Sequence, residues 1–109
     1  MYPKSIAKKI VKAALSKKAE DIKVFKVSEK SSISDYLIIA TSRSLVQTRA
    51  IVEEIHKAIK KNIKPLHIED AKGWTLIDYG SVIVNIFEEE YRSFYQLETL
   101  WADSPRVEI

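Results

Sequence analysis

The feature that most constrains the fold of this 109-residue chain is a glycine-serine pair between two β-favouring segments. Residues 74–79 (WTLIDY) alternate large and β-favouring side chains, and residues 82–87 (VIVNIF) are rich in β-branched ones. Gly80 and Ser81 lie between them, with glycine first. This is the chemistry of a two-residue type II′ turn, because its first central residue needs a positive φ. The sequence therefore predicts a β-hairpin.

The expected turn also sets the register of the hairpin, with Tyr79 opposite Val82. Because side chains alternate along a strand, this register sorts the residues onto two faces. One face is almost purely apolar and is expected to be core: Thr75, Ile77, Tyr79, Val82, Val84 and Ile86. The other face is mixed: Trp74, Leu76, Asp78, Ile83, Asn85 and Phe87. A mixed face is expected to be partly exposed or covered by a partner.

The rest of the chain predicts further strands and helices in the order α-β-β-α-β-β-β-α. The expected elements are a helix at 5–18, strands at 21–27 and 35–41, a helix at 45–61, a short strand at 66–69, a turn at 70–73, the hairpin and a last helix from Glu88. Residues 35–41 are apolar at their centre, which predicts burial on both faces. Ser44 and Gln47 form a capping-box pattern. Residues after Asp103 are expected to form a short, loose tail.

These elements predict one domain spanning residues 1–109, of the α/β (α+β) class. A strand-helix-strand succession implies a parallel crossover, and the hairpin adds an antiparallel pair. The expected architecture is therefore a mixed five-stranded sheet flanked by helices.

Charge is unevenly distributed along the chain. Residues 1–64 contain 15 Lys and Arg against 6 Asp and Glu, whereas residues 65–109 contain 3 against 9. A basic half favours an RNA-rich neighbourhood, and an acidic half favours a basic protein partner, although lysines also simply solvate helix surfaces. The absence of cysteine excludes disulfides, and no apolar run approaches a membrane span. The absence of a secretory signal or presequence leads us to expect a cytoplasmic protein that does not enter a membrane.

Two groups of residues are candidates for a phosphate site and a metal site, and neither pattern is complete. Ser42, Arg43 and Ser44 at a helix start could hold a phosphate, but no glycine there allows close approach of a triphosphate. His67 with Glu69 and Asp70 could hold a metal, yet no further ligand or orienting partner is evident. His56 is expected to be a solvated surface residue. No Ser-His-acid set or Asp-x-Asp pair appears, so we expect no catalytic residue, no metal and no cofactor.

A partner-binding surface on the hairpin is the better interpretation. Aromatic residues are frequent interface anchors, and neighbouring carboxylates would complement Lys and Arg on a partner. The alternative for Trp74 is burial under a helix. The candidate residues are Glu69, Asp70, Gly73, Trp74, Leu76, Asp78 and Tyr79.

Three stretches of the chain resemble the ribosomal silencing factor family, also called RsfS or Iojap-like proteins. They read DYLIIATSRS, WTLIDYGSVIVNIF and YRSFYQLETLW, in that order. The resemblance implies a fold like a degenerate nucleotidyltransferase without enzymatic activity. It implies binding to the large ribosomal subunit, chiefly through ribosomal protein fourteen, where the protein blocks joining of the small subunit and represses translation. Some members of the family look like homodimers when free. In the complex with the large subunit we expect the lysine-rich helices of this chain to lie near rRNA. A residual nucleotide-binding or nucleotidyl-transfer enzyme is the alternative, and a general RNA-binding module is a third.

The family signatures fall on two parts of this chain. The hairpin signature falls on Gly73, Trp74, Asp78, Tyr79 and Gly80, which the resemblance assigns to the partner surface. The C-terminal signature, assigned mostly to packing, falls on Phe94, Tyr95, Leu97, Glu98, Leu100 and Trp101. The chain departs from the family at Asp70, where glycine is usual, and at Asn85, where histidine is usual. An amide at position 85 still offers a hydrogen-bond donor and an acceptor.

Overall fold

The computed structural model describes residues 2–28, 34–59, 63–95 and 104–107. The elements follow the predicted order, and their bounds lie within a few residues of those expected. They are α1 (Pro3–Ser16), β1 (Glu20–Lys26), β2 (Tyr36–Ser42), α2 (Leu45–Ile59), β3 (His67–Ala71), β4 (Trp74–Asp78), β5 (Val82–Glu88) and α3 (Glu89–Tyr95).

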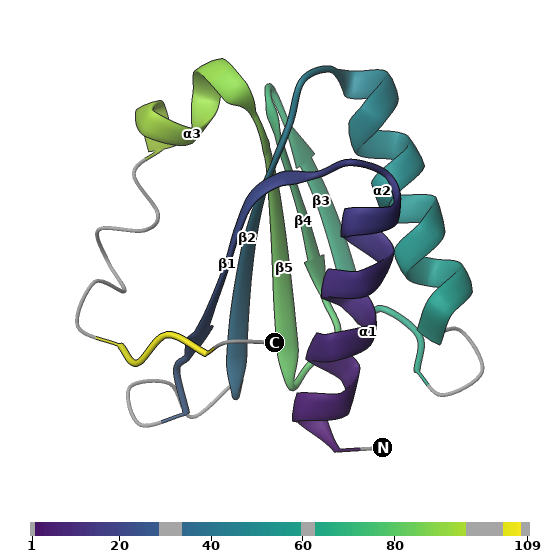
Figure 1. Cartoon of the computed structure of the whole chain (residues 1–109), viewed down its shortest axis with the longest axis vertical. Coiled ribbons are helices and arrows are strands. Elements are labelled where there is room, and N and C mark those ends of the chain that lie inside the picture. The colour runs from purple at the N-terminus through teal and green to yellow at the C-terminus, as the bar shows by residue number, and fades with distance from the viewer. Residues whose placement is uncertain (1, 29–33, 60–62, 96–103, 108–109) are drawn as a thin grey trace.

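The five strands form one mixed sheet in the order β1-β2-β5-β4-β3. Only β2 and β5 pair in parallel, and the other neighbours are antiparallel. The crossover through α2 does connect parallel strands, but β5 and β4 are inserted between β2 and β3. In Figure 1, α1 and α2 lie side by side on one face of the sheet, and α3 follows β5 at one end. The predicted fold class is confirmed.

The central hairpin has the predicted register. The Tyr79 amide donates to the Val82 carbonyl over 2.9 Å, and Leu76 lies opposite Asn85. Gly80 has φ +86°, the positive value that the turn requires. The Asp78 carboxylate accepts a 2.7 Å hydrogen bond from the Gly80 amide, which further fixes the turn.

Two hydrophobic clusters lie on the two sides of the sheet. Apolar side chains of α1 and α2 pack against the predicted core face of the hairpin, where Ile77, Val84 and Ile86 are buried. The smaller cluster on the other face includes Phe25, Leu37, Ile39 and Phe87, with Trp74 and Ile83 packed against it. Because β2 contributes to both clusters, the prediction that it is buried on both faces is confirmed.

The predicted cap of α2 is present and also connects the two long helices. Ser44 Oγ accepts a hydrogen bond from the Gln47 amide at 3.1 Å, as in a capping box. The Gln47 side chain accepts from the Arg43 amide instead of the Ser44 amide, and it donates to the Lys17 and Lys18 carbonyls after α1. One side chain therefore fixes the end of α1 to the start of α2.

Two local predictions were wrong. The turn expected at 70–73 is shorter, because Asp70 and Ala71 pair with β4 as part of β3. The chain after 103 is not a loose tail over its described part. The Pro105 carbonyl accepts from the Lys26 amide at 2.8 Å, and the Val107 amide donates to the Val24 carbonyl at 2.9 Å. Backbone hydrogen bonds to β1 thus fix residues 105–107.

Candidate partner-binding surface

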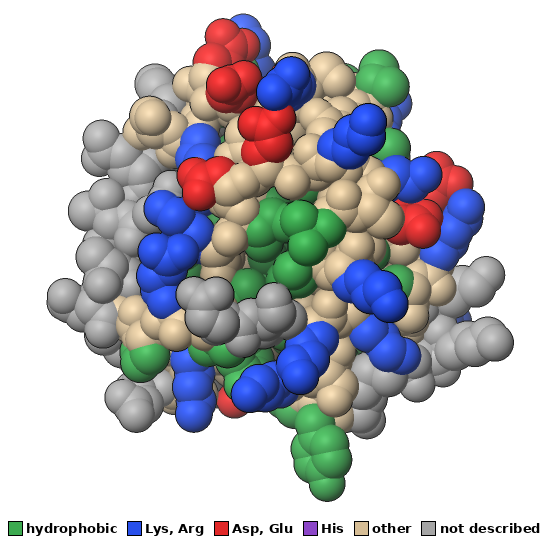
Figure 2. All heavy atoms as spheres, viewed as in Figure 1, with side chains coloured by type: hydrophobic (Ala, Val, Ile, Leu, Met, Phe, Trp, Pro, Cys, Tyr) green, Lys and Arg blue, Asp and Glu red, His purple; other side chains and the backbone are tan. Residues whose placement is uncertain are grey.

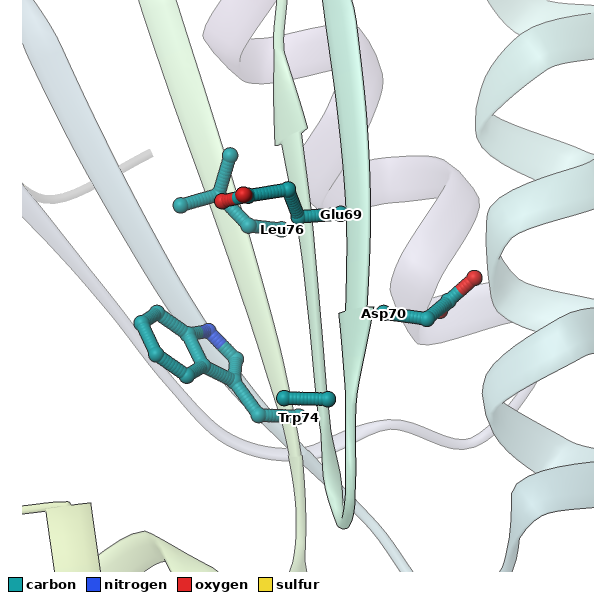
Figure 3. Close-up of a pocket in the computed structure, with 5 residues that line it drawn as sticks. Glu69, Asp70, Trp74 and Leu76 are labelled. Carbon is teal, nitrogen blue, oxygen red and sulfur yellow. The ribbon is translucent and has the colours of Figure 1, made fainter.

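Several predicted site residues line one hollow on the sheet face opposite α1 and α2. Its volume is about 280 Å³. Cross-strand pairing explains its composition, because Glu69 lies opposite Leu76 and Ala71 lies opposite Trp74. Figure 3 shows the side chains of Glu69, Leu76 and Trp74 extending to the same side of the sheet. The lining residues are Glu69, Asp70, Ala71, Trp74 and Leu76.

Trp74 is held firmly in a half-buried position. Its ring stacks on Phe87, with centroids 5.4 Å apart and an interplanar angle of 20°. The indole Nε1 donates a 3.0 Å hydrogen bond to Asn85 Oδ1. The two expectations for Trp74 are therefore both partly met, since it packs on the core and also lines an accessible hollow. A preorganised aromatic side chain loses little entropy when a partner covers it.

Asn85 is almost completely buried, with 1% of its surface exposed. Because Nε1 of Trp74 is a donor only, the bonded amide atom must be Oδ1. The amide nitrogen has no hydrogen-bond partner among the described residues. The buried amide of Asn85 thus serves as the hydrogen-bond acceptor for the indole.

Glu69 provides an exposed carboxylate at the rim of the hollow. His67 Nε2 lies 3.5 Å from Glu69 Oε1, and both side chains are more than half exposed. An exposed pair of this kind contributes little stability, so the carboxylate can exchange partners readily. The described residues that line this hollow include no Lys or Arg. It therefore suits a cationic side chain, which could contact both the carboxylate and the indole.

Asp70 is separated from the other candidate residues. Figure 3 shows its side chain directed toward α2, away from Trp74 and Glu69. Its Oδ1 accepts a 2.8 Å hydrogen bond from Thr75 Oγ1. The alternation of side chains along β3 also separates the three candidate metal ligands, because His67 and Glu69 lie on the face opposite to Asp70. Within the described residues no group of three His, Cys, Asp or Glu is arranged to hold a metal ion.

Tyr79, expected at the partner surface, lies in the core with 2% of its surface exposed. Its hydroxyl lies 2.7 Å from Nδ1 of His56 on α2. Burial raises the pKa of Tyr79, and burial lowers the pKa of His56. Both shifts favour a neutral phenol that is hydrogen-bonded to a neutral imidazole. The prediction that His56 is a solvated surface residue was wrong, because its side chain is a partner of this buried hydroxyl.

Gly73 and Asp78 fix the backbone conformation at the two ends of β4. Gly73 has φ +73°, and a Cβ placed on it would lie 2.1 Å from the Tyr91 ring. Only glycine fits there, because both the backbone conformation and the close contact exclude a side chain. Asp78 is half-buried and caps the Gly80 amide. These residues shape the surface from beneath it.

The side chains of the turn at 42–44, a candidate phosphate site by sequence, make hydrogen bonds and an ion pair within the protein. Ser42 Oγ contacts Thr48 Oγ1 and donates to the Ser44 carbonyl, and Ser44 Oγ caps α2. Arg43 pairs with Glu20 at 2.7 Å. These contacts account for the residue types at this turn without a ligand.

Lysines cover the outer side of α1. Figure 2 shows Lys and Arg side chains spread widely over the face of the molecule that carries this helix. Six lysines of α1 and the turn after it are exposed: Lys4, Lys8, Lys9, Lys12, Lys17 and Lys18. The basic surface thus lies across the sheet from the hollow that contains Trp74.

Sequence reasoning missed Ala71 and the residues of a second hollow between β3 and α2. This second hollow has a volume of about 290 Å³. Its lining comes from both elements and from β4: Thr48, Arg49, Val52, Glu53, His56, Ile68, Asp70 and Thr75. The alternation of β3 could have placed Ile68 and Asp70 together, but the proximity of α2 depends on tertiary packing. Of the C-terminal signature, Phe94 and Tyr95 lie in α3, and Leu97, Glu98, Leu100 and Trp101 lie outside the described residues.

The chain thus forms a small α+β domain with a half-buried tryptophan beside an exposed carboxylate on one sheet face. The family model described as "Ribosomal silencing factor during starvation" matches residues 2–109. The ribosomal silencing factor RsfS of Bacillus subtilis is 36% identical over 112 residues, covering 100% of this chain and 95% of that protein. The chain therefore belongs to the ribosomal silencing factor family, whose name describes regulation and no catalytic reaction.

Solved structures agree with this assignment. A crystal structure of a Chromobacterium violaceum protein has a TM-score of 0.88 at 27% identity, covering 94% of this chain and 88% of that one. A second, of a Bacillus halodurans protein, has a TM-score of 0.84 at 31% identity, covering 97% and 99%. Among the described residues, no helix is long and apolar enough to span a membrane.

Proposed function

We propose that this protein represses translation by binding the large ribosomal subunit, chiefly through ribosomal protein fourteen, and sterically blocking the small subunit. Membership of the ribosomal silencing factor family supports the ribosome as the target. The observation that carries the choice of surface is the hollow beside Trp74, with its rim carboxylate and without a Lys or Arg among its described lining residues. The proposal requires no catalytic step, because an occupied docking face is enough to prevent subunit joining.

The hollow suits a basic protein surface. Trp74 and Leu76 provide apolar contact area, and Glu69 provides the charge that would select a Lys or Arg of the partner. Tyr79 and Gly73 contribute indirectly, since they fix the hairpin from within. The proposed contact residues are accordingly Glu69, Trp74 and Leu76. Asp78 lies on the same face of β4 as Trp74 and Leu76, whereas Asp70 is directed toward α2 (Figure 3).

The lysines of α1 are proposed to add attraction to nearby rRNA. Such attraction is independent of sequence and weakens as salt concentration rises. It would strengthen binding without determining where the protein docks. The protein is then expected to bind large subunits more tightly than either ribosomal protein fourteen or naked rRNA alone.

The test is binding of the purified protein to large ribosomal subunits, followed by a subunit-joining assay. Trp74→Ala is expected to weaken binding by about 30-fold or more, as for a central aromatic anchor. Glu69→Lys reverses the charge at the rim without disturbing a buried contact, and it is expected to weaken binding by about tenfold. Glu90→Lys is the matched control, because Glu90 is an exposed carboxylate at the start of α3.

Three results would contradict the proposal in different ways. Binding that survives both Trp74→Ala and Glu69→Lys would place the contact elsewhere. Equally tight binding to naked rRNA would favour a general RNA-binding module. No binding to large subunits, with a melting temperature raised by nucleotide and divalent metal, would favour a nucleotide-binding enzyme.

A further inference from the structure

The two edge strands of the sheet differ in whether another described segment of the chain pairs with them. At one edge, residues 105–107 bond to β1, and Phe25 forms an isolated antiparallel bridge with Arg106. At the other edge lies β3, and no described strand pairs with its outer side. All five residues of β3 are exposed. An exposed edge strand is a template for another strand unless the protein covers it.

The hydrogen-bond pattern identifies which groups of β3 face outward. The Tyr79 amide donates to the Val82 carbonyl, and the Glu88 amide donates to the Gly73 carbonyl. The odd-numbered residues from 73 to 79 therefore direct their backbone amide and carbonyl groups toward β5. Even-numbered residues of β4 therefore bond toward β3. Their partners are His67, Glu69 and Ala71. The amide and carbonyl groups of Ile68 and Asp70 consequently point away from the sheet.

A hollow lies on each face of this edge strand. The first contains Glu69 with Trp74, and the second contains Ile68 and Asp70 beside α2. A strand that pairs with β3 would direct alternate side chains to opposite faces. Successive side chains of that strand would thus enter the two hollows in turn. Ile68 is 43% exposed and Leu66 is 75% exposed, so apolar surface is also available along the edge.

We propose that the open edge of β3 takes up an extended, cationic segment of the partner as an additional strand of the sheet. This inference rests on the proposed function, and it specifies how the partner binds the same surface. Main-chain hydrogen bonds from Ile68 and Asp70 provide affinity, and the two hollows provide specificity.

The charges of the hollows determine the chemistry of the segment. On the Trp74 side the described lining residues provide the Glu69 carboxylate and no Lys or Arg, so a cationic side chain of the segment is accommodated there. On the α2 side Arg49 already lies among Glu53 and Asp70, and Ile68 and Val52 add apolar surface. An apolar residue suits that side. The segment is therefore expected to alternate basic residues with apolar ones.

Hydrogen exchange of the wild-type protein tests the proposal without any substitution. In the free protein the amides of Ile68 and Asp70 should exchange rapidly, whereas the Glu69 amide should exchange slowly. Adding purified large ribosomal subunits should slow exchange at Ile68 and Asp70 by at least about tenfold, because each amide gains an acceptor. Unchanged exchange at both amides in a bound complex would overturn the strand-addition model.

A proline substitution tests the same hydrogen bonds by removal. Ile68→Pro deletes an outward amide and leaves the bonds between β3 and β4 in place, which an edge strand tolerates. The control Ile68→Ala truncates the side chain and keeps the amide. Ile68→Pro should weaken binding to large subunits by about tenfold more than Ile68→Ala. Circular dichroism establishes that both variants are folded.

The remaining outcomes separate the two proposals. Equal binding of Ile68→Pro and Ile68→Ala, with binding still lost in Trp74→Ala, would overturn strand addition and keep the proposed function. Absence of binding by the wild type would overturn both. If Ile68→Pro instead abolishes a wild-type dimer in sedimentation and leaves subunit binding unchanged, the occupant of the edge is a second copy of the chain, and the proposal fails.

Discussion

The two faces of the β4–β5 hairpin have opposite characters although they share one backbone. On the face under α1 and α2, Ile77, Val84 and Ile86 are at most 1% exposed. On the other face Trp74 and Leu76 are half-buried beside an accessible hollow. Alternate residues of a strand belong to opposite faces, so one register places one set of side chains in the core under the helices and the other set on the surface proposed to bind the partner. Substitutions on the two faces should therefore have separable effects.

The largest effect on stability is expected on the helix-covered face. Ile86 is completely buried among side chains of α1, α2 and the sheet. Ile86→Ala should lower the free energy of unfolding by about 3 kcal/mol, because it leaves a cavity that rigid neighbours cannot fill. Urea denaturation measures this loss. The folded variant should bind large subunits with wild-type affinity, and a parallel loss of affinity would show that the faces are not independent.

Asn85 sharpens the comparison, because it is buried and yet belongs to the recognition face. Asn85→Leu removes the acceptor for Trp74 Nε1 and leaves the indole less firmly oriented. Binding to large subunits should weaken about fivefold, corresponding to about 1 kcal/mol for one hydrogen bond. The measurement is a binding titration, with stability followed by urea denaturation.

The control for this substitution is Asn85→His, which restores a ring nitrogen as acceptor at a similar depth. It should recover most of the affinity. If Asn85→Leu and Asn85→His bind equally, orientation of the indole by residue 85 does not contribute to recognition. An equal loss of stability in both variants, with no change in affinity, would assign Asn85 to packing alone.

The hairpin could be predicted from sequence because its determinants are local. Glycine at position 80 requires a particular turn, and the turn sets the register of every pair from Tyr79 to Trp74. The cap of α2 was local in the same way, with Ser44 and Gln47 three residues apart. The double burial of β2 followed from its continuous apolar centre.

The strand order could not be predicted, because it depends on pairings between distant segments. The parallel pairing of β2 with β5 joins residues more than 40 positions apart. The same limit explains the error at Tyr79. An aromatic residue beside a turn is typical of an interface, but a hydrogen bond between its hydroxyl and His56 on α2 allows Tyr79 to be buried in the core. The prediction for Asp70 failed for another reason. The sequence predicted that the strand ends at residue 69, so the alternation of side chains was not extended to Asp70.

Tyr79→Phe tests whether Tyr79 belongs to the core or to the partner surface. Removing the hydroxyl deletes the hydrogen bond to His56 Nδ1 and keeps the packed ring. The free energy of unfolding should fall by about 1 kcal/mol, and binding to large subunits should not change. Thermal or urea denaturation measures the first quantity, and a binding titration measures the second. A loss of affinity at unchanged stability would return Tyr79 to the recognition surface.

The smallest expected effect is the pH dependence of folding stability that His56 contributes. Burial lowers the pKa of His56 below its ordinary value of 6.5. Between that lower value and 6.5 the unfolded chain binds more protons than the folded one, so stability should rise with pH in this interval. The contribution is complete above pH 6.5 and is lost as the pH falls through the folded pKa.

Because Glu53 and Asp70 line the hollow beside His56, the contribution of the imidazole must be isolated by substitution. His56→Gln keeps a polar side chain that cannot titrate, so unfolding free energies measured from pH 5 to pH 8 should depend less on pH in the variant than in the wild type. Large-subunit affinity should respond to pH equally in both proteins, because the added strand is expected to place an apolar side chain, and no charged one, in the hollow that His56 lines. A change in the pH dependence of affinity, with none in that of stability, would show that the charge of His56 affects recognition and not folding.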